Sequence, residues 1–297
     1  MSDRETHVSG SATGAPAANP PRMPHWLRGR WSWVARGAAA LAIVVLLATC
    51  GGGDDGGFEG VGALADSTAA TATTTSTTTE TADALPPDSS WVAEANEGLS
   101  EVPVYAEPGA AEPIHRLANP KRVDDAGNTA PLVFLVDGLD VSGEWLPVHL
   151  PVPPNGTMGF VRSADVDLYT HDYRITVRLA EHRLTLTKGG EPVLEATVGL
   201  GRAGRETPVG LYFITELLQA PDPGGIYGPF AYGISGFQDD PEVREEFGGE
   251  AVIGIHGTNQ PELLGQNVSS GCIRVSNDDI TAMKEMLPLG VPVELIA

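Results

Sequence analysis

Cys272 and His256 are the residues whose types best fit a chemical role, and they lie 16 positions apart in the sequence. Cys272 directly follows Gly271, and His256 directly follows the apolar run AVIGI. A protonated thiol is a weak nucleophile, and a neighbouring histidine can lower its pKa to give a reactive thiolate. A glycine before the sulfur leaves room for a substrate carbonyl, and backbone N–H groups at such a turn can stabilise an oxyanion. These residues predict a nucleophile–base pair for acyl transfer, with Gly271 at the oxyanion site.

A simpler interpretation of Cys272 stays open, because an unpaired cysteine also packs well as a small core residue. The only other cysteine, Cys50, lies far away in a segment of different composition. An odd thiol in an exported protein is either a hazard or a functional group. The adjacent glycine and the upstream histidine favour the functional interpretation, although spacing does not by itself establish contact.

Four further positions near this pair have two interpretations each. We expect Arg274 to grip a substrate carboxylate with its planar fork, or else to form a structural salt bridge. Ser269 and Ser270 either line a pocket or satisfy backbone groups of a turn. Gly257 either supplies a backbone carbonyl that orients the pair or is a plain turn residue.

Residues 219–250 are acidic and rich in glycine and proline, and they predict a long loop. A loop of that length inside a compact domain is usually functional and often a lid; the alternative is a disordered insertion. Tyr227, Phe230 and Tyr232 are expected to wall a pocket on the lid side, or else to belong to the core. Residues 199–204 (GLGRAG) predict a turn rather than a phosphate-binding loop, because no helical pattern follows them.

The elements that must position these residues are predominantly short strands. Residues 171–297 open with alternating apolar positions around Ile175 and Val177, and further strand patterns follow. A short helix is expected near the end, with Asn277 as its N-cap. Residues 91–170 contain short β-type runs separated by glycine, proline and asparagine turns. The sequence therefore predicts a mainly β protein with two folded units.

The N-terminal part has the pattern of an export signal. In residues 1–49, arginines precede an uncharged apolar run that is too short for a comfortable membrane span. The run ends at Cys50, in a setting that resembles a bacterial lipobox, whose cysteine receives a lipid; an uncleaved anchor helix is the alternative. Residues 50–90 have a Gly-, Thr-, Ser- and Pro-rich composition that predicts a disordered linker. We therefore expect the folded part to lie outside the cytoplasm, lipid-anchored to the outer face of the cytoplasmic membrane.

Composition limits the classes of partner. The formal net charge is −21, and this argues against nucleic acid, because phosphate binding needs a basic surface. The seven histidines are scattered and form no Cys/His cluster at metal-ligand spacing. We expect neither a metal nor a cofactor.

The segment IHGTNQPELLGQNVSSGCIRVSNDDI resembles the signature of the L,D-transpeptidase family, whose catalytic domain is of the YkuD type. The similarity covers residues 172–297, including RLTLTKGGEPVLEATVGLG, TPVGLYFIT and YGPFAYGISGF. It implies a β-sandwich catalytic domain with a short helix and a lid loop. The stretch GEWLPVHLPVPPNGTMGFVRSADV resembles the small SH3-like domain that precedes the catalytic domain in some cell-wall enzymes.

The resemblance also implies an activity. Members use the cysteine to attack the peptide stem of peptidoglycan, expel the terminal D-alanine and pass the acyl group to a neighbouring stem. The acceptor is normally the side-chain amine of diaminopimelate, which gives a 3→3 cross-link. By resemblance Cys272 is the nucleophile and His256 the general base, and carbapenem-type inhibitors are expected to acylate Cys272.

One position departs from the family pattern, since a histidine usually stands directly before the Gly-Cys pair and this chain has Ser270. Alternatives to cross-linking stay open on the sequence alone. Water as acceptor makes the protein an L,D-carboxypeptidase, and a protein lysine as acceptor makes it an anchoring enzyme. A non-catalytic peptidoglycan-binding envelope lipoprotein is the alternative from another class.

Overall fold

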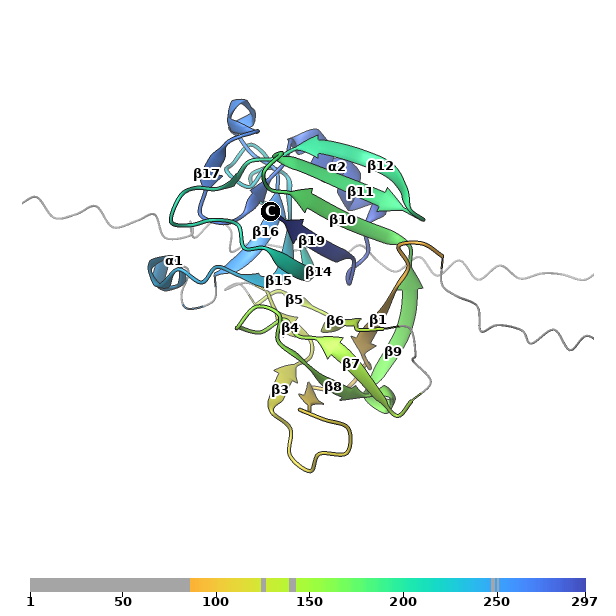
Figure 1. The fold of residues 1–297 in the computed structure, drawn as a ribbon. Coiled ribbons are helices and arrows are strands. Elements are labelled where there is room, and N and C mark those ends of the chain that lie inside the picture. The colour runs from red at the N-terminus through yellow and green to blue at the C-terminus, as the bar shows by residue number, and fades with distance from the viewer. Residues whose placement is uncertain (1–85, 124–126, 139–142, 247–248, 250) are drawn as a thin grey trace, which may run out of the picture. The chain divides into compact units, whose positions relative to one another are not determined.

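The computed structural model describes residues 86–123, 127–138, 143–246, 249 and 251–297 (Figure 1). The predicted signal peptide, Cys50 and nearly all of the predicted linker lie outside the described residues. All described residues belong to one compact unit. Within them, no helix is long and apolar enough to cross a membrane.

The first part of the fold is an antiparallel five-stranded sheet with the strand order β8-β7-β6-β1-β9. Its strands are β1 (Ser90–Ala95), β6 (Val133–Val136), β7 (Trp145–His149), β8 (Met158–Arg162) and β9 (Val166–His171). Two hairpins accompany it, formed by β2 (Glu101–Val104) with β3 (His115–Ala118) and β4 (Lys121–Arg122) with β5 (Thr129–Ala130). Alternating apolar residues form its core, and a 3₁₀ turn at Ser163–Asp165 precedes β9. The strand patterns expected in residues 91–170 are confirmed.

The second part is an eight-stranded mixed sheet with the order β12-β11-β10-β19-β14-β15-β16-β18. Its strands are β10 (Tyr173–Arg178), β11 (Arg183–Lys188), β12 (Glu191–Thr197), β14 (Gly210–Gln219), β15 (Phe230–Phe237), β16 (Val252–His256), β18 (Ile273–Arg274) and β19 (Pro292–Ile296). A separate pair joins β13 (Leu200–Gly201) to β17 (Asn267–Ser269). The helices are α1 (Pro241–Glu246) and α2 (Asn277–Met286), and a 3₁₀ turn spans Pro261–Leu263. The mainly β prediction is confirmed.

The core of this second sheet follows the period-two pattern of its strands. Ile175 and Val177 on β10 and Leu184 and Leu186 on β11 have no exposed surface. They pack with residues of β14, β15, β16 and α2 in one apolar cluster. The outward-facing positions of the same strands are polar, so burial fixes the register.

Helix α2 begins one residue earlier than expected, because Ser276 is its N-cap. The Ser276 hydroxyl accepts a hydrogen bond from the Asp279 N–H at 3.0 Å, which satisfies one of the unpaired amide groups of the first turn. The side chain of Asn277 turns away from the helix and accepts from the Thr258 N–H at 2.8 Å. Asn277 therefore ties the helix to the segment after β16 and does not cap it.

The expectation of one long loop over residues 219–250 is wrong, because a buried strand, β15, occupies its middle. Glycines hide the strand pattern. A Cβ on Gly233 would lie 2.4 Å from a Glu216 carboxylate oxygen, and one on Gly236 would lie 2.9 Å from the ring of Tyr212. These glycines make room for large side chains of the neighbouring strand, which the alternation of residue types does not reveal.

Contacts between the two sheets are specific. Val92, Val133 and Leu135 pack against Phe213 in a small buried cluster. The Asn155 side chain pairs with the backbone of Phe237, donating to its carbonyl and accepting from its N–H, both at 2.8 Å. The first sheet therefore binds the chain at the end of β15, directly before the segment that leads to α1.

Candidate active site

Strands β16 and β18 bring Cys272 and His256 to the same place. The two strands are parallel neighbours, with His256 paired to Arg274. Ile253 and Ile255 point into the core, so Gly254 and His256 face the opposite side. A Cβ on Gly254 would lie 3.9 Å from both the Cys272 Sγ and the His256 Cδ2. The thiol and the imidazole therefore both lie against Gly254.

The imidazole of His256 has a defined tautomer. Its Nδ1 lies 2.6 Å from the Gly257 carbonyl oxygen, which can only accept, so Nδ1 carries the hydrogen. The lone pair therefore sits on Nε2. The carbonyl contact expected of Gly257 is present and orients the ring.

Burial keeps His256 neutral. The residue is 4 % exposed, and desolvation lowers its pKa to about 4, with a further lowering from the Arg274 charge and an opposing effect from the Gly257 hydrogen bond. An imidazole with this pKa is unprotonated at neutral pH. It is therefore able to accept a proton through Nε2.

Burial also raises the pKa of the Cys272 thiol and keeps it protonated at rest. Desolvation raises the pKa of Cys272, although the Gly254 N–H and the Arg274 charge act in the opposite direction. The Gly254 N–H donates to Sγ at 3.4 Å. Because the imidazole is neutral, it supplies no positive charge to stabilise a thiolate. The resting pair is a thiol beside a neutral base.

The turn before the nucleophile is held by side chains. The Gly271 N–H donates to Ser269 Oγ at 3.1 Å, and that hydroxyl donates to the Cys272 carbonyl at 2.6 Å. The Gly271 carbonyl accepts from the Thr207 hydroxyl at 2.9 Å. Ser269 thus satisfies backbone groups of the turn, the second of its two interpretations. Since the Gly271 N–H is already used, the next backbone N–H along the chain, that of Cys272, is the candidate donor for an oxyanion.

Gly271 is required by its conformation and by its neighbours. Its φ is +117°, a backbone conformation that residues other than glycine rarely adopt. A Cβ there would lie 2.7 Å from Gln238 Nε2 and 2.9 Å from Ile253 Cδ1. Gln238 is buried and also donates to the Glu206 carbonyl at 2.9 Å, so it cannot move without a further loss.

Arg274 has no acidic partner within ion-pair distance among the described residues. Its Nη1 donates to Gln260 Oε1 at 3.3 Å, and its Nε is buried without a hydrogen-bond partner in the same described set. Its charge lowers the pKa values of Cys272 and His256. A structural salt bridge is thus not what the structure shows, and the buried Nε is a donor that is left unpaired among the described residues.

The aromatic residues expected to wall the pocket separate into two groups. The Tyr227 ring meets the His256 ring edge-on, with centroids 5.0 Å apart. Burial raises the pKa of Tyr227 to about 12, and negative charge on Cys272 is the next largest cause. Tyr232 has no exposed surface, and its hydroxyl donates to the Met283 carbonyl in the core. Tyr232 faces away from His256 and has no surface with which to contact a substrate. Phe230 is half-buried beside the Lys284 ammonium.

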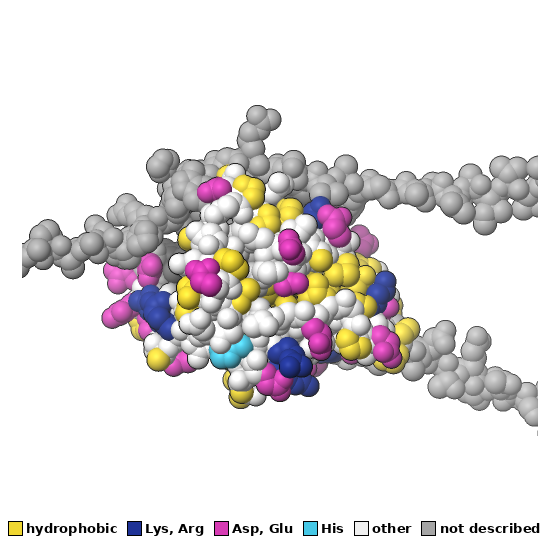
Figure 2. Space-filling model, turned by 90° about the horizontal axis from the view of Figure 1, so that it is seen from above, with side chains coloured by type: hydrophobic (Ala, Val, Ile, Leu, Met, Phe, Trp, Pro, Cys, Tyr) yellow, Lys and Arg dark blue, Asp and Glu magenta, His cyan; other side chains and the backbone are white. Residues whose placement is uncertain are grey.

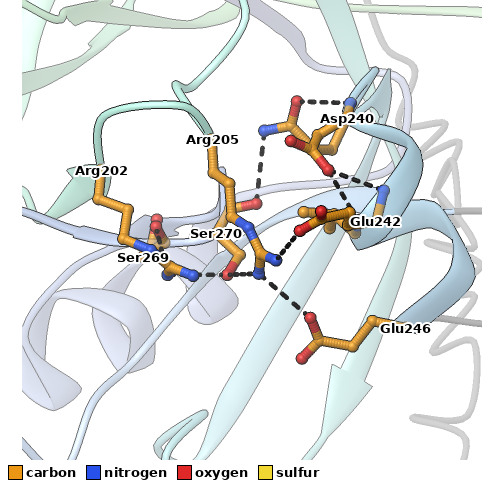
Figure 3. A network of polar contacts seen from close by, with 9 residues as sticks. Arg202, Arg205, Asp240, Glu242, Glu246, Ser269 and Ser270 are labelled. Atoms are coloured by element: carbon orange, nitrogen blue, oxygen red, sulfur yellow. Dashed lines mark hydrogen bonds and ion pairs between the residues drawn. The ribbon is translucent and has the colours of Figure 1, made fainter. Parts of the chain in front are cut away.

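An ionic network that sequence reasoning missed surrounds Ser270 (Figure 3). Arg202 and Arg205 both donate to the Ser270 hydroxyl, at 3.0 and 3.3 Å. Arg205 also contacts Glu246 at 3.1 Å and Glu242 at 3.6 Å, both on α1. The Arg205 N–H donates to the Arg202 carbonyl at 2.9 Å, so the turn expected in residues 199–204 begins only at Arg202, after the short strand β13. That turn places the two arginines, and nothing in the sequence pairs it with residue 270.

A cavity of about 190 Å³ lies elsewhere, between the two sheets. Ser89, His149, Arg174 and Leu211 are among its lining residues. None of the predicted site residues lines it. The cavity is therefore separate from the residues around Cys272 described above.

Comparisons with known proteins agree with the geometry. The family model described as the L,D-transpeptidase catalytic domain (YkuD) matches residues 172–295. The YkuD protein of Bacillus subtilis is 30% identical over 129 residues, which cover 43% of this chain and 69% of that protein. The YkuD protein of Bacillus licheniformis is 31% identical over 126 residues, which cover 42% and 67%.

Among solved structures, L,D-transpeptidase 3 from Mycobacterium tuberculosis, in complex with a faropenem-derived adduct, is 15% identical with a TM-score of 0.36. That match covers 56% of this chain and 91% of the other. The two Bacillus relatives are matched over more than two thirds of their own length at 30% identity or more. The chain belongs to the L,D-transpeptidase family.

Proposed function

We propose that this protein is a peptidoglycan L,D-transpeptidase that forms 3→3 cross-links through a thioester on Cys272. The observation that supports this most directly is that the Cys272 thiol and the neutral His256 imidazole both lie against Gly254. The pair stands in a chain of the L,D-transpeptidase family. The proposed donor is a stem peptide that ends in D-alanine, and the proposed acceptor is the side-chain amine of diaminopimelate in a second stem.

In the acylation step, Sγ attacks the carbonyl carbon of the peptide bond before the terminal D-alanine. Nε2 of His256 takes the thiol proton as the S–C bond forms, so a thiolate is never free in the resting enzyme. The oxyanion accepts a hydrogen bond from the Cys272 N–H. The imidazolium then gives its proton to the leaving amine, the C–N bond breaks, and D-alanine departs from the thioester.

In the transfer step, the acceptor amine attacks the thioester carbonyl while Nε2 of His256 takes one of its protons. The C–S bond breaks, the amide bond of the cross-link forms, and the proton returns to the sulfur. Arg274 is the group proposed to stabilise negative charge on the sulfur, because its charge lowers the pKa of Cys272. The outer nitrogens of its guanidinium, of which Nη1 contacts Gln260, are also proposed to bind a substrate carboxylate.

The test is to incubate the protein with tetrapeptide stems and to identify the products by mass spectrometry. We expect 3→3 dimers with the wild type and none with Cys272→Ala, whose circular dichroism spectrum should be unchanged. A carbapenem should add its mass to the wild type and not to the variant. Dimers from Cys272→Ala would refute the thioester, and tripeptide without dimer would assign water as the acceptor. A wild type with neither product nor adduct would favour a binding protein.

We also propose that a lipid on Cys50 anchors the protein at the outer face of the cytoplasmic membrane. The apolar run before Cys50 and the Thr/Ser-rich segment after it support this proposal. The test is cell fractionation. The wild type should be found with membranes and Cys50→Ala should be released from them, whereas equal distribution of both would refute the lipid anchor.

A further inference from the structure

Two guanidinium groups converge on one neutral oxygen next to the nucleophile. Arg202 and Arg205 each donate through Nη1 to the Ser270 hydroxyl, at 3.0 and 3.3 Å, as Figure 3 shows. Ser270 is two residues before Cys272. Two like charges that share one hydroxyl repel each other unless an anion lies nearby.

Of these two charges, the described residues neutralise that of Arg205. Arg205 pairs with Glu246 at 3.1 Å and, more weakly, with the exposed Glu242 at 3.6 Å. Arg202 has no carboxylate within 4.0 Å among the described residues. Other basic residues of this chain, whose net charge is −21, have acidic partners, among them Lys121 and Arg174, whereas Arg202 and Arg274 have none among the described residues.

Figure 2 shows how charged side chains are distributed over one face of the protein. On the face drawn in Figure 2, acidic side chains are spread widely, and several of the basic side chains lie beside them. An unneutralised guanidinium on such a surface is the favoured place for an anionic ligand, because the surrounding acids repel anions elsewhere.

Arg202 is also held in place. Its backbone N–H donates to the Ser269 carbonyl at 3.0 Å, and its Nη1 also lies 3.3 Å from that oxygen. The side chain is exposed, and within the described part of the chain its Nε and Nη2 have no acceptor. A guanidinium fixed through one nitrogen and open at the others is prepared for bidentate binding of a carboxylate.

We propose that Arg202, positioned by Ser270 and Arg205, forms a carboxylate subsite that selects donor stems with a free carboxylate. The subsite lies beside Ser270, two residues before Cys272 in the sequence, whereas Arg274 lies two residues after it. This inference rests on the proposed function, since the donor is taken to be a stem peptide. Two carboxylates of the donor fit the subsite, that of the leaving D-alanine and that of the diaminopimelate side chain.

The experiment compares wild type, Arg202→Gln and Arg202→Lys on stems that carry either carboxylate free or as the carboxamide. We expect Arg202→Gln to raise KM about ten-fold for the free-acid stem and to leave kcat unchanged, which is the loss expected for one exposed charge-assisted contact. The effect should disappear for only one of the two carboxamide stems, namely the stem that lacks the carboxylate bound by Arg202. Arg202→Lys should restore part of the affinity.

Two controls separate this subsite from a structural role. Arg116→Gln removes an equally exposed arginine that pairs with Glu101 in the first sheet and should change nothing. Alkylation of Cys272 by neutral iodoacetamide should be as fast in Arg202→Gln as in wild type. Equal losses on acid and carboxamide stems, or no loss on any stem, would overturn the subsite.

Binding to the Cys272→Ala protein, measured by calorimetry, tests the same inference without turnover. A free-acid stem should bind about ten-fold more weakly when Arg202→Gln is added. If the wild type forms no product but this difference is present, the subsite stands and the proposed function fails. If product forms and the difference is absent, the subsite fails alone.

Discussion

The two flanks of Cys272 differ in the kind of interaction that holds them. On the His256 side, backbone contacts and buried rings position the imidazole, and burial keeps it neutral. On the Ser270 side, arginines and the acids of α1 form ionic contacts, and Glu242 in that set is 86% exposed. Geometry fixed in a buried region changes reactivity strongly when it is lost, whereas exposed ion pairs contribute little and weaken with salt. The first flank therefore sets how Cys272 reacts, and the second sets what binds beside it.

Replacing His256 should change the reactivity of Cys272 more than any other substitution considered for the two flanks. His256→Gln removes the base but retains a polar side chain, and we expect cross-linking and carbapenem acylation to fall by about 10²- to 10⁴-fold. Stopped-flow measurement of acylation checks this. His182→Gln, at a half-buried position that contacts Asn267, is the matched control and should retain the wild-type rate. A fast His256→Gln protein would place the base elsewhere.

The free energy of unfolding should depend on pH through His256. The pKa of a histidine is near 6.5 in the unfolded chain and is about 4 in the folded protein, so the unfolded state binds more protons between these values. Stability is fully present above pH 6.5 and decreases as pH falls toward 4, by about 3 kcal/mol from this residue. Urea titrations at several pH values measure it.

The His256→Gln protein should lose that part of the pH dependence. Lowered pKa values of His149 and His171 leave a smaller slope of the same sign in the variant. Identical slopes in wild type and variant would contradict the burial of a neutral imidazole.

Gly271→Ala should destabilise the turn by about 1–3 kcal/mol and slow acylation, because strained φ and two close contacts combine. Gly109→Ala is the matched control, since Gly109 has a φ of +80° but no atom within 4 Å of the place that a Cβ would take. Thermal melting and iodoacetamide alkylation of both proteins distinguish crowding at Gln238 from backbone strain alone. Equal losses in the two variants would show that the contacts of Gly271 are unimportant.

Substitutions on the Ser270 side should have the smallest effect on stability. Glu246→Gln removes the closer partner of Arg205, and we expect a stability loss below about 1 kcal/mol that vanishes at high salt. Melting curves at low and high salt measure this. A large loss that persists in high salt would mean that the Ser270 side is as rigid as the His256 side.

The sequence was sufficient for the strands whose apolar residues alternate and for the meeting of Cys272 with His256. It failed at β15, because Gly233 and Gly236 accommodate side chains of another strand and break the pattern. The raised pKa of the thiol depends on burial, which residue types alone do not reveal. The contact of Arg202 and Arg205 with Ser270 joins segments more than sixty residues apart. A local sequence pattern cannot predict such a contact.

The pairing of Asn155 with Phe237 gives the catalytic turn an anchor that dissolved ions do not weaken. Both partners are uncharged amide groups, and the next residue, Gln238, approaches the Ser270 carbonyl at 3.4 Å. High salt should therefore loosen α1 while this tether keeps Cys272 aligned. Asn155→Ala should make the alkylation rate of Cys272 vary with salt, and a rate as constant as that of the wild type would show that the tether is dispensable.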